Sequence, residues 1–317
     1  MKYKTIGEVK RNSLKLDNLI AKDAQIEVLA EGFDWSEGPI WVSELNALLF
    51  SDIPPNNIHI WREGDTEAAL FIHPSGYTGS KERTGEPGSN GLILDAAGKL
   101  ILCQHGDRQL ARLTNSFENP SPPVYQTIAD KHNGKRFNSP NDVVQKSNGD
   151  FYFTDPPYGL EKNMDDPLKE IPYQGVYRVN SQGEVTLLTE EMSRPNGLAF
   201  SPDESKLYVA NSDPENPVWM VFDLDAEGLL QNGKVFFDVT GFEGKGLPDG
   251  MKVDPQGNIY ATGPGGVLVF DSDANHLGTI WTTEATANCA FGGPSSDYLY
   301  MTADMYLTRI KLVNPGL

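Results

Sequence analysis

One short pattern recurs six times along the chain and constrains its fold more than any other feature of the sequence. Each copy is a β-rich run of four residues that ends in a small or polar residue: "LLFS", "LILC", "FYFT", "LYVA", "IYAT" and "LYMT". The last residues of these runs, which we call the anchors, are Ser51, Cys103, Thr154, Ala210, Thr262 and Thr302. Repeats with a period of about 50 residues are typical of propellers and other repeat architectures.

The segments on either side of the anchors have the composition of antiparallel hairpins. Turn residues precede most anchors, as in "DAAGK" and "DPQGN", and a second strand-like run follows, as in "GVYRV" and "GVLVF". Each unit therefore supplies several antiparallel strands. Small sheets that repeat around one axis form a β-propeller, so the sequence predicts an all-β protein, a six-bladed β-propeller.

The two ends of the chain are expected to meet in the last blade. The sixth unit begins late and leaves little chain for an outer strand, whereas the strand-like segment 25–32 ("QIEVLAEG") precedes the first unit. We expect this N-terminal strand to close the last blade; the alternative is an ordinary edge strand. The expected organisation is a surface arm over residues 1–24 and a single propeller domain over residues 25–317.

A second repeated feature lies thirteen or fourteen residues before each anchor, where the innermost strand of each blade should begin. These positions hold Glu37, Asn90, Asn141, Asn196, Asp249 and Cys289. Equivalent positions in a propeller lie at one height around the central channel, so five oxygen-bearing side chains would face one axis. Such groups are costly to desolvate without a partner. The alternative is simple turn formation, which Pro248 and Gly250 suit, but Glu37 has no turn preference.

A hard divalent cation would supply the missing partner. Carboxylate and amide oxygens without His or thiolate ligands suit Ca²⁺ or Mg²⁺, with Mn²⁺ and Zn²⁺ as alternatives. Zinc is disfavoured, because Cys289 alone makes a poor thiolate site. The formal net charge of −18 agrees with a cationic partner. It argues against binding to nucleic acid or to an anionic membrane surface.

Three further features of the sequence bear on where the protein works. No apolar stretch is long enough to span a membrane. The N-terminus lacks the apolar run of a signal peptide, and the two cysteines do not form a disulfide framework. We therefore expect a cytoplasmic protein, with a trimmed leader as the alternative; the sequence indicates no oligomeric state.

The predicted topology brings other residues to the mouth of the channel. His105 follows the second anchor and is either a hydrogen-bonding or proton-transfer group or a structural surface histidine. Arg136 and Asn138 precede the third blade, and Arg136 either binds an oxygen-rich ligand or lies on the surface. Segments 73–89 and 156–175 have no strand pattern, and we expect both to wall a substrate pocket.

Several motifs resemble those of the gluconolactonase/regucalcin (senescence marker protein) family of six-bladed propellers. They are "WSEGPIW", "EPGSNGL", "RFNSPNDVV", "FTDPPYGL", "RPNGLAFSPD" and "LPDGMKVDPQGNIYAT", and two of them are similar to the bacterial gluconolactonase branch. The resemblance, which begins at about residue 27, implies a single divalent cation, commonly Ca²⁺. It implies hydrolysis of a sugar lactone, with Asp249 as general base. The residues that match the family's metal ligands are Glu37, Asn141, Asn196 and Asp249.

The resemblance also implies contacts for a small-molecule lactone. Asn90 would contact water or substrate. His105, Arg136 and Asn138 are candidates to hold the sugar because the predicted topology, not the resemblance, brings them to the mouth. The animal branch has an arginine two residues before the metal-binding asparagine, and here that position is Ser139. Two other functions stay open: a related metal-dependent lactonase or phosphotriesterase with a non-sugar substrate, and a non-enzymatic propeller for metal binding or protein interaction.

Overall fold

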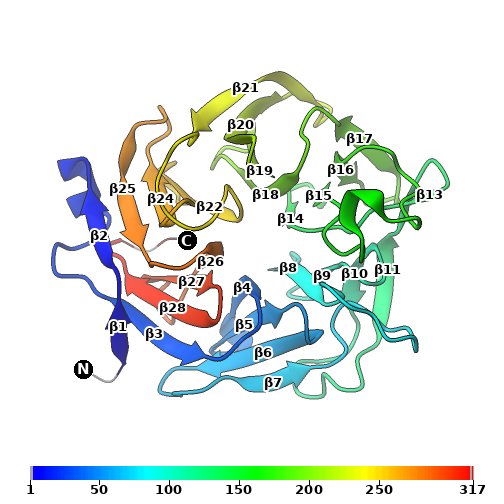
Figure 1. Cartoon of the computed structure of the whole chain (residues 1–317), viewed down its shortest axis with the longest axis horizontal. Helices are drawn as coiled ribbons and strands as arrows, with labels where there is room; N and C mark the ends of the chain where they lie inside the picture. The colour runs from blue at the N-terminus through cyan, green and yellow to red at the C-terminus, as the bar shows by residue number, and fades with distance from the viewer. Residues whose placement is uncertain (1–2, 315, 317) are drawn as a thin grey trace.

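Six antiparallel sheets surround a central opening in the computed structural model (Figure 1). The structure describes residues 3–314 and 316, so residues 1 and 2 of the expected arm and the C-terminal residues 315 and 317 lie outside the described chain. The prediction of a six-bladed β-propeller is confirmed.

The blades follow one another in chain order, each running from the channel outward. Blade 1 contains β4 (Ser36–Val42), β5 (Ala47–Asp52), β6 (Asn57–Arg62) and β7 (Ala69–Ile72). Blade 2 contains β8 (Ser89–Leu94), β9 (Leu100–Gln104), β10 (Gln109–Leu113) and β11 (Tyr125–Ala129). Blade 3 contains β14 (Val143–Gln145), β15 (Phe151–Asp155), β16 (Gly175–Val179) and β17 (Val185–Thr189). Blade 4 contains β18 (Pro195–Phe200), β19 (Lys206–Asp213), β20 (Asn216–Leu224) and β21 (Leu230–Asp238).

The last two blades include strands from the N-terminus. Blade 5 contains β22 (Met251–Val253), β23 (Ile259–Gly263), β24 (Gly266–Phe270), β25 (His276–Trp281) and, at its outer edge, β2 (Glu8–Arg11). Blade 6 contains β26 (Thr286–Gly292), β27 (Tyr298–Ala303), β28 (Tyr306–Lys311), β3 (Ile26–Glu31) and β1 (Lys4–Ile6). Because β3 pairs antiparallel with β28, the predicted closure of the last blade by an N-terminal strand is confirmed.

The segment before β3 is bound to the propeller at several points. Strand β1 extends blade 6, strand β2 extends blade 5, and the 3-10 helix η1 (Leu14–Asn18) follows them. Leu16 and Ile20 are fully buried in the apolar cluster between these two blades. The N-terminal residues therefore connect the outer edges of the two blades on either side of one interface.

The remaining elements are short. A two-stranded ribbon pairs β12 (Lys131–His132) with β13 (Lys135–Arg136), and two more 3-10 helices are η2 (Ser43–Leu45) and η3 (Asn163–Asp165). In the described chain, no helix is long and apolar enough to cross a membrane.

The apolar core is divided among the spaces between neighbouring blades. The buried apolar side chains of the described residues form six clusters, and each joins two adjacent sheets. Between blades 4 and 5, for example, the rings of Trp219 and Phe270 pack edge to face with centroids 5.5 Å apart. Strands such as β24 are buried throughout because both faces of a blade contact a neighbour.

Strands β4, β8, β14, β18, β22 and β26 line the central channel (Figure 1). The blades approach one another so closely there that Gly250 has no room for a side chain, because a Cβ atom would lie 2.1 Å from Cγ of Asn288. Its φ angle is not in the left-handed region, so close packing rather than turn geometry requires a glycine here.

Candidate functional site

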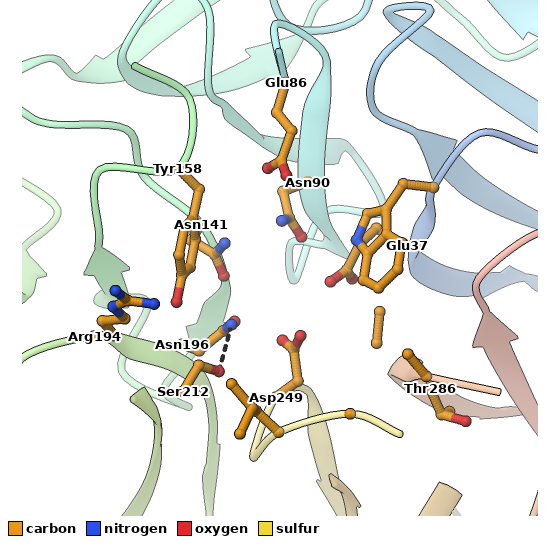
Figure 2. Close-up of a pocket in the computed structure, with 15 residues that line it drawn as sticks. Glu37, Glu86, Asn90, Asn141, Tyr158, Arg194, Asn196, Ser212, Asp249 and Thr286 are labelled. Carbon is orange, nitrogen blue, oxygen red and sulfur yellow. Dashed lines mark hydrogen bonds between the residues drawn. The ribbon is translucent and has the colours of Figure 1, made fainter. Parts of the chain in front are cut away.

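A cavity of about 380 Å³ opens at one end of the channel (Figure 2). It is lined by Trp35, Glu37, Glu86, Asn90, Asn141, Tyr158, Arg194, Asn196, Ser212, Gly246, Leu247, Asp249, Ala285, Thr286 and Ala287. All five predicted oxygen-bearing side chains are in this set, and we call Glu37, Asn90, Asn141, Asn196 and Asp249 the oxygen ring.

The sixth position of the ring is Ala287, and the prediction of Cys289 was wrong. In neighbouring blades, the glycine after one ring residue donates its N–H to the carbonyl of the next, as Gly91 does to Asn141 (2.8 Å). Gly250 donates in the same way to Ala287 (2.8 Å). Ala287 lies 15 residues before the anchor Thr302, whereas the other ring residues lie 13 or 14 residues before theirs. Cys289 is instead buried in the apolar core.

Several oxygen atoms of the ring have no partner. Oδ1 of Asn90, Oδ1 of Asn141 and Oδ1 of Asp249 are buried and accept no hydrogen bond from any described residue. Buried polar atoms are nearly always paired, so three orphan acceptors in one cavity indicate a missing positively charged or hydrogen-bonding group.

The two carboxyl groups of the ring are held in an unfavourable environment. Glu37 is 2% exposed, and its Oε2 accepts a hydrogen bond from the N–H of Gly38 (2.8 Å). Burial raises the pKa of Glu37 to about 8. The pKa of Asp249 is also raised, first by burial and then by the nearby charges of Glu37 and Asp142. A bound cation would offset both effects.

This donor set fits a hard divalent cation. The ring combines two carboxylates with amide oxygens, which are ligands that Ca²⁺ and Mg²⁺ prefer. No three His, Cys, Asp or Glu side chains of the described residues are grouped so that they could hold a metal ion, so a cation here would depend on the amide oxygens of the ring as well as on its two carboxylates. The ring residues therefore suit Ca²⁺, Mg²⁺ or Mn²⁺, which prefer oxygen ligands, better than Zn²⁺.

Ser212 determines which end of the Asn196 amide faces the cavity. The Ser212 hydroxyl donates its only proton to the carbonyl oxygen of Pro248, so its Oγ can only accept from Asn196. Nδ2 of Asn196 donates to that Oγ at 3.0 Å (dashed line in Figure 2). Oδ1 of Asn196 is thereby left for the cavity.

His105 lies behind the wall of the cavity and does not line it. The side chain is fully buried, and burial lowers its pKa to about 3, so the imidazole is neutral. Its Nε2 lies 3.5 Å from Nδ2 of Asn141. With the amide NH₂ directed to the histidine, Oδ1 of Asn141 faces the other way.

Arg136 and Asn138 also lie outside the cavity lining. Arg136 donates from Nη2 to the carbonyl of Asp107, and Asn138 donates from Nδ2 to the carbonyls of Asp155 (3.1 Å) and Tyr173 (2.8 Å). The carboxylate of Asp155 accepts the backbone N–H groups of Asn138 and Ser139, and so holds the turn that leads into blade 3. Substrate contact by Arg136 or Asn138 has no support in this geometry.

Sequence analysis missed three lining residues that share a simple position. Trp35, Arg194 and Leu247 each stand two residues before a member of the ring. Side chains two positions apart in extended backbone point to the same side. The same alternation applied to the ring would have identified all three.

The two long loops each contribute one side chain to the cavity. Segment 73–89 supplies Glu86, and segment 156–175 supplies Tyr158. Arg83 joins the two loops, because its guanidinium donates to the carbonyls of Gly106 and Gly159, both at 2.7 Å. Tyr158 follows the anchor Thr154 by four residues, and its position after the anchor predicts that it lies at the channel mouth. Glu86 is not marked by any repeat, so spacing from the anchors could not identify it.

The chain is similar in sequence to one known protein family and in structure to solved members of it. Residues 35–304 match the family described as the SMP-30/gluconolactonase/LRE-like region. A gluconolactonase of Zymomonas mobilis is 39% identical over 322 residues, which cover 98% of this chain and 88% of that protein. The pentonolactonase XacC of Haloferax volcanii is 34% identical over 130 residues, 40% of this chain and 44% of that protein. A solved gluconolactonase of Xanthomonas campestris superposes with a TM-score of 0.83 at 28% identity, over 98% of this chain and 97% of that one.

Proposed function

Because the chain belongs to the SMP-30/gluconolactonase/LRE-like family, we propose that it hydrolyses a sugar lactone in the axial cavity with the help of one divalent cation. The observation that carries the proposal is the set of buried oxygen atoms without partners in the ring. Such an arrangement is costly in the folded protein unless a ligand compensates it.

Glu37, Asn141, Asn196 and Asp249 would hold the cation, and Ca²⁺ is the ion we expect. When bound, it would polarise the lactone carbonyl and stabilise negative charge on the carbonyl oxygen. Ser212 and His105 support the arrangement, because each faces the NH₂ end of one ring amide and leaves the oxygen free.

Asp249 would act as the general base. It is buried at the cavity wall, and its Oδ1 accepts no hydrogen bond from the described residues, so that atom is free to take a proton. A water molecule that attacks the lactone carbonyl would transfer a proton to this oxygen as the new C–O bond forms.

The rest of the cavity suits a polyhydroxylated ring. Asn90 has an unpaired acceptor, Ser212 and Tyr158 carry hydroxyl groups, and Arg194 offers several donors. The guanidinium of Arg194 makes no hydrogen bond or ion pair with a described residue, which leaves it available for the substrate. Arg194 therefore takes the role that the sequence suggested for Arg136.

The function is tested by measuring hydrolysis of glucono-1,5-lactone by wild-type protein, chelated protein and Asp249→Asn. We expect turnover above the uncatalysed rate, loss of turnover after chelation, and recovery when Ca²⁺ is added back. Asp249→Asn with a saturating cation should lose at least about 100-fold in kcat, as expected for a general base. Near-wild-type turnover by this variant would contradict the assignment of Asp249.

The choice of sugar is tested in the same assay. Relatives of this chain are named for both hexono- and pentonolactones, so a pentonolactone belongs in the substrate set. A phosphotriester and an aromatic lactone represent the non-sugar alternatives. Sugar lactones should have the highest kcat/KM, and a preference for the phosphotriester would contradict the proposal.

A further inference from the structure

Glu86 lines the cavity, and no hydrogen bond of its carboxyl group to a described residue stabilises the fold. Its carboxyl oxygens form no hydrogen bond within the described chain, and Oε2 lies 3.7 Å from Nδ1 of His105. Glu86 and Asp249 point into the same cavity from opposite sides (Figure 2). A group bound between them would have one carboxyl on each side.

The loop that carries Glu86 is firmly held. The side-chain oxygen of Asn56 accepts the backbone N–H groups of three successive residues at the start of this loop, Ser75, Gly76 and Tyr77. Arg83, three residues before Glu86, is bonded to two carbonyls, and Gly88, two residues after it, donates to the carbonyl of Ile53 (3.0 Å). The position of Glu86 is therefore set by its neighbours, while its own carboxyl is left free.

The surroundings of Glu86 favour a proton on the carboxyl. Its place in the cavity raises its pKa to about 7 through partial burial, with 37% of the side chain still exposed. The groups around it are neutral His105 on the β9–β10 turn, Tyr158 on the second loop, and the acids Glu37 and Asp249 across the cavity. The guanidinium of Arg83 is engaged with two backbone carbonyls, so it forms no ion pair with Glu86.

We propose that Glu86 is the general acid of the reaction and donates its proton to the ring oxygen of the lactone as the ring opens. The inference rests on the proposed function and adds the second proton transfer that ring opening needs. An alcohol leaves poorly as an alkoxide, so protonation by a positioned acid accelerates the step by about 100-fold or more.

The proton balance is complete with two carboxyl groups. Attack forms a bond between the water oxygen and the carbonyl carbon, and the water proton goes to Asp249. The bond between that carbon and the ring oxygen then breaks, its electron pair stays on the ring oxygen, and the proton of Glu86 converts that oxygen to a hydroxyl. Asp249 ends protonated and Glu86 ionised, and exchange with solvent restores both groups.

The test compares leaving groups in wild-type protein and Glu86→Gln, a variant of the same shape that cannot act as an acid. On an aldonolactone, whose leaving group is an alcohol, kcat should fall by about 100-fold. On dihydrocoumarin, whose leaving group is a phenol with a pKa of about 10, it should fall by less than about threefold. Equal losses on both substrates, or no loss on the aldonolactone, would overturn the proposal.

Two further measurements keep the result clear. Calorimetric titration should give the same Ca²⁺ affinity for wild type and Glu86→Gln. The matched control is Glu82→Gln, an exposed change in the same loop outside the cavity lining, which should leave kcat unchanged.

The pH dependence of the rate gives an independent readout. Wild-type kcat on the aldonolactone, corrected for the uncatalysed rate, should decline as the pH rises through about 7, because the acid must be protonated. The variant should lack that decline, and a persisting decline would also overturn the proposal.

These outcomes separate the two claims. If wild-type protein does not hydrolyse lactones at all, the proposed function fails. If wild-type protein is active and Glu86→Gln matches it on both substrates and at every pH, only the role of Glu86 fails.

Discussion

The chemistry of the cavity depends on which atom of each side chain faces inward. An asparagine amide offers an oxygen or an NH₂ group, and only the oxygen can bind a cation. Asn196 is oriented by a hydroxyl whose single proton is used elsewhere, and Asn141 by a neutral histidine. Mutation of a group that orients a metal ligand typically lowers metal affinity or activity by about 10- to 100-fold.

Replacing Ser212 by Ala should therefore weaken cation binding without removing a ligand. The Asn196 amide would lose the acceptor that holds its NH₂ group, and we expect the Kd for Ca²⁺, measured by calorimetry, to rise by about tenfold. Ser212→Thr, which keeps the hydroxyl, should restore most of the affinity.

The matched control for this prediction is Ser201→Ala. Ser201 uses its hydroxyl in the turn before β19, where it accepts from the N–H of Lys206 (3.0 Å), and it does not line the cavity. This variant should lose stability with no change in Kd. A loss of affinity equal to that of Ser212→Ala would show that the effect is general destabilisation.

The innermost strands begin at residues that are regularly spaced from the anchors in the sequence, and the fold arranges these residues in a ring around the channel. Five of the six ring positions could be predicted by counting back from the anchors, because in five blades the ring residue lies 13 or 14 residues before its anchor. The sixth could not, because Ala287 lies 15 residues before Thr302, outside the spacing of 13 or 14 residues that the other five blades share. The irregularity in β26 is not the reason, because β4, β8 and β18 have an equivalent one.

These strands also explain the glycine after Asp249. A methyl group on Gly250 would meet the side chain of Asn288 in blade 6. Gly250→Ala should destabilise the protein by about 1–3 kcal/mol through overpacking, measured from urea unfolding. Because the three closest atoms all belong to the Asn288 side chain, the double variant Gly250→Ala/Asn288→Ala should recover part of that loss. Additive losses in this double-mutant cycle would contradict the steric explanation.

For the molecule as a whole, the sequence was sufficient to predict the six blades and the closure by β3. It did not indicate that residues 4–11 form the strands β1 and β2. Both strands are short outer strands whose side chains are mostly exposed or half-buried, so they lack the apolar alternation that marks a strand in the sequence. Only pairing with β3 and β25 makes them strands.

The buried part of this N-terminal region should contribute strongly to stability. Leu16 is fully buried between blades 5 and 6, whereas Leu14 is 82% exposed. Leu16→Ala should cost about 2–5 kcal/mol in the free energy of unfolding, and Leu14→Ala should cost less than about 0.5 kcal/mol. Chemical denaturation of both variants measures the difference, and equal small effects would mean that the N-terminal region is not part of the cooperative fold.

The buried carboxyl groups also predict how stability depends on pH when the cation is removed. The folded-state pKa of Glu37 is raised from its ordinary 4.5 to about 8. A raised pKa contributes stability that is complete below the ordinary value and is lost as the pH rises toward the folded-state value. The Tm of chelated protein should therefore fall, relative to that of Ca²⁺-saturated protein, between about pH 5 and pH 8. A difference in Tm that does not change with pH would contradict this expectation.

The central claim is that the oxygen ring binds one divalent cation on the propeller axis. The most direct measurement is anomalous diffraction from a crystal of the protein grown with Mn²⁺, which has a strong anomalous signal and the same preference for oxygen ligands. We predict one strong peak on the axis, at roughly 2.0–2.6 Å from side-chain oxygens of Glu37, Asn141, Asn196 and Asp249. A ring without a peak, or a peak coordinated by other residues, would contradict the account.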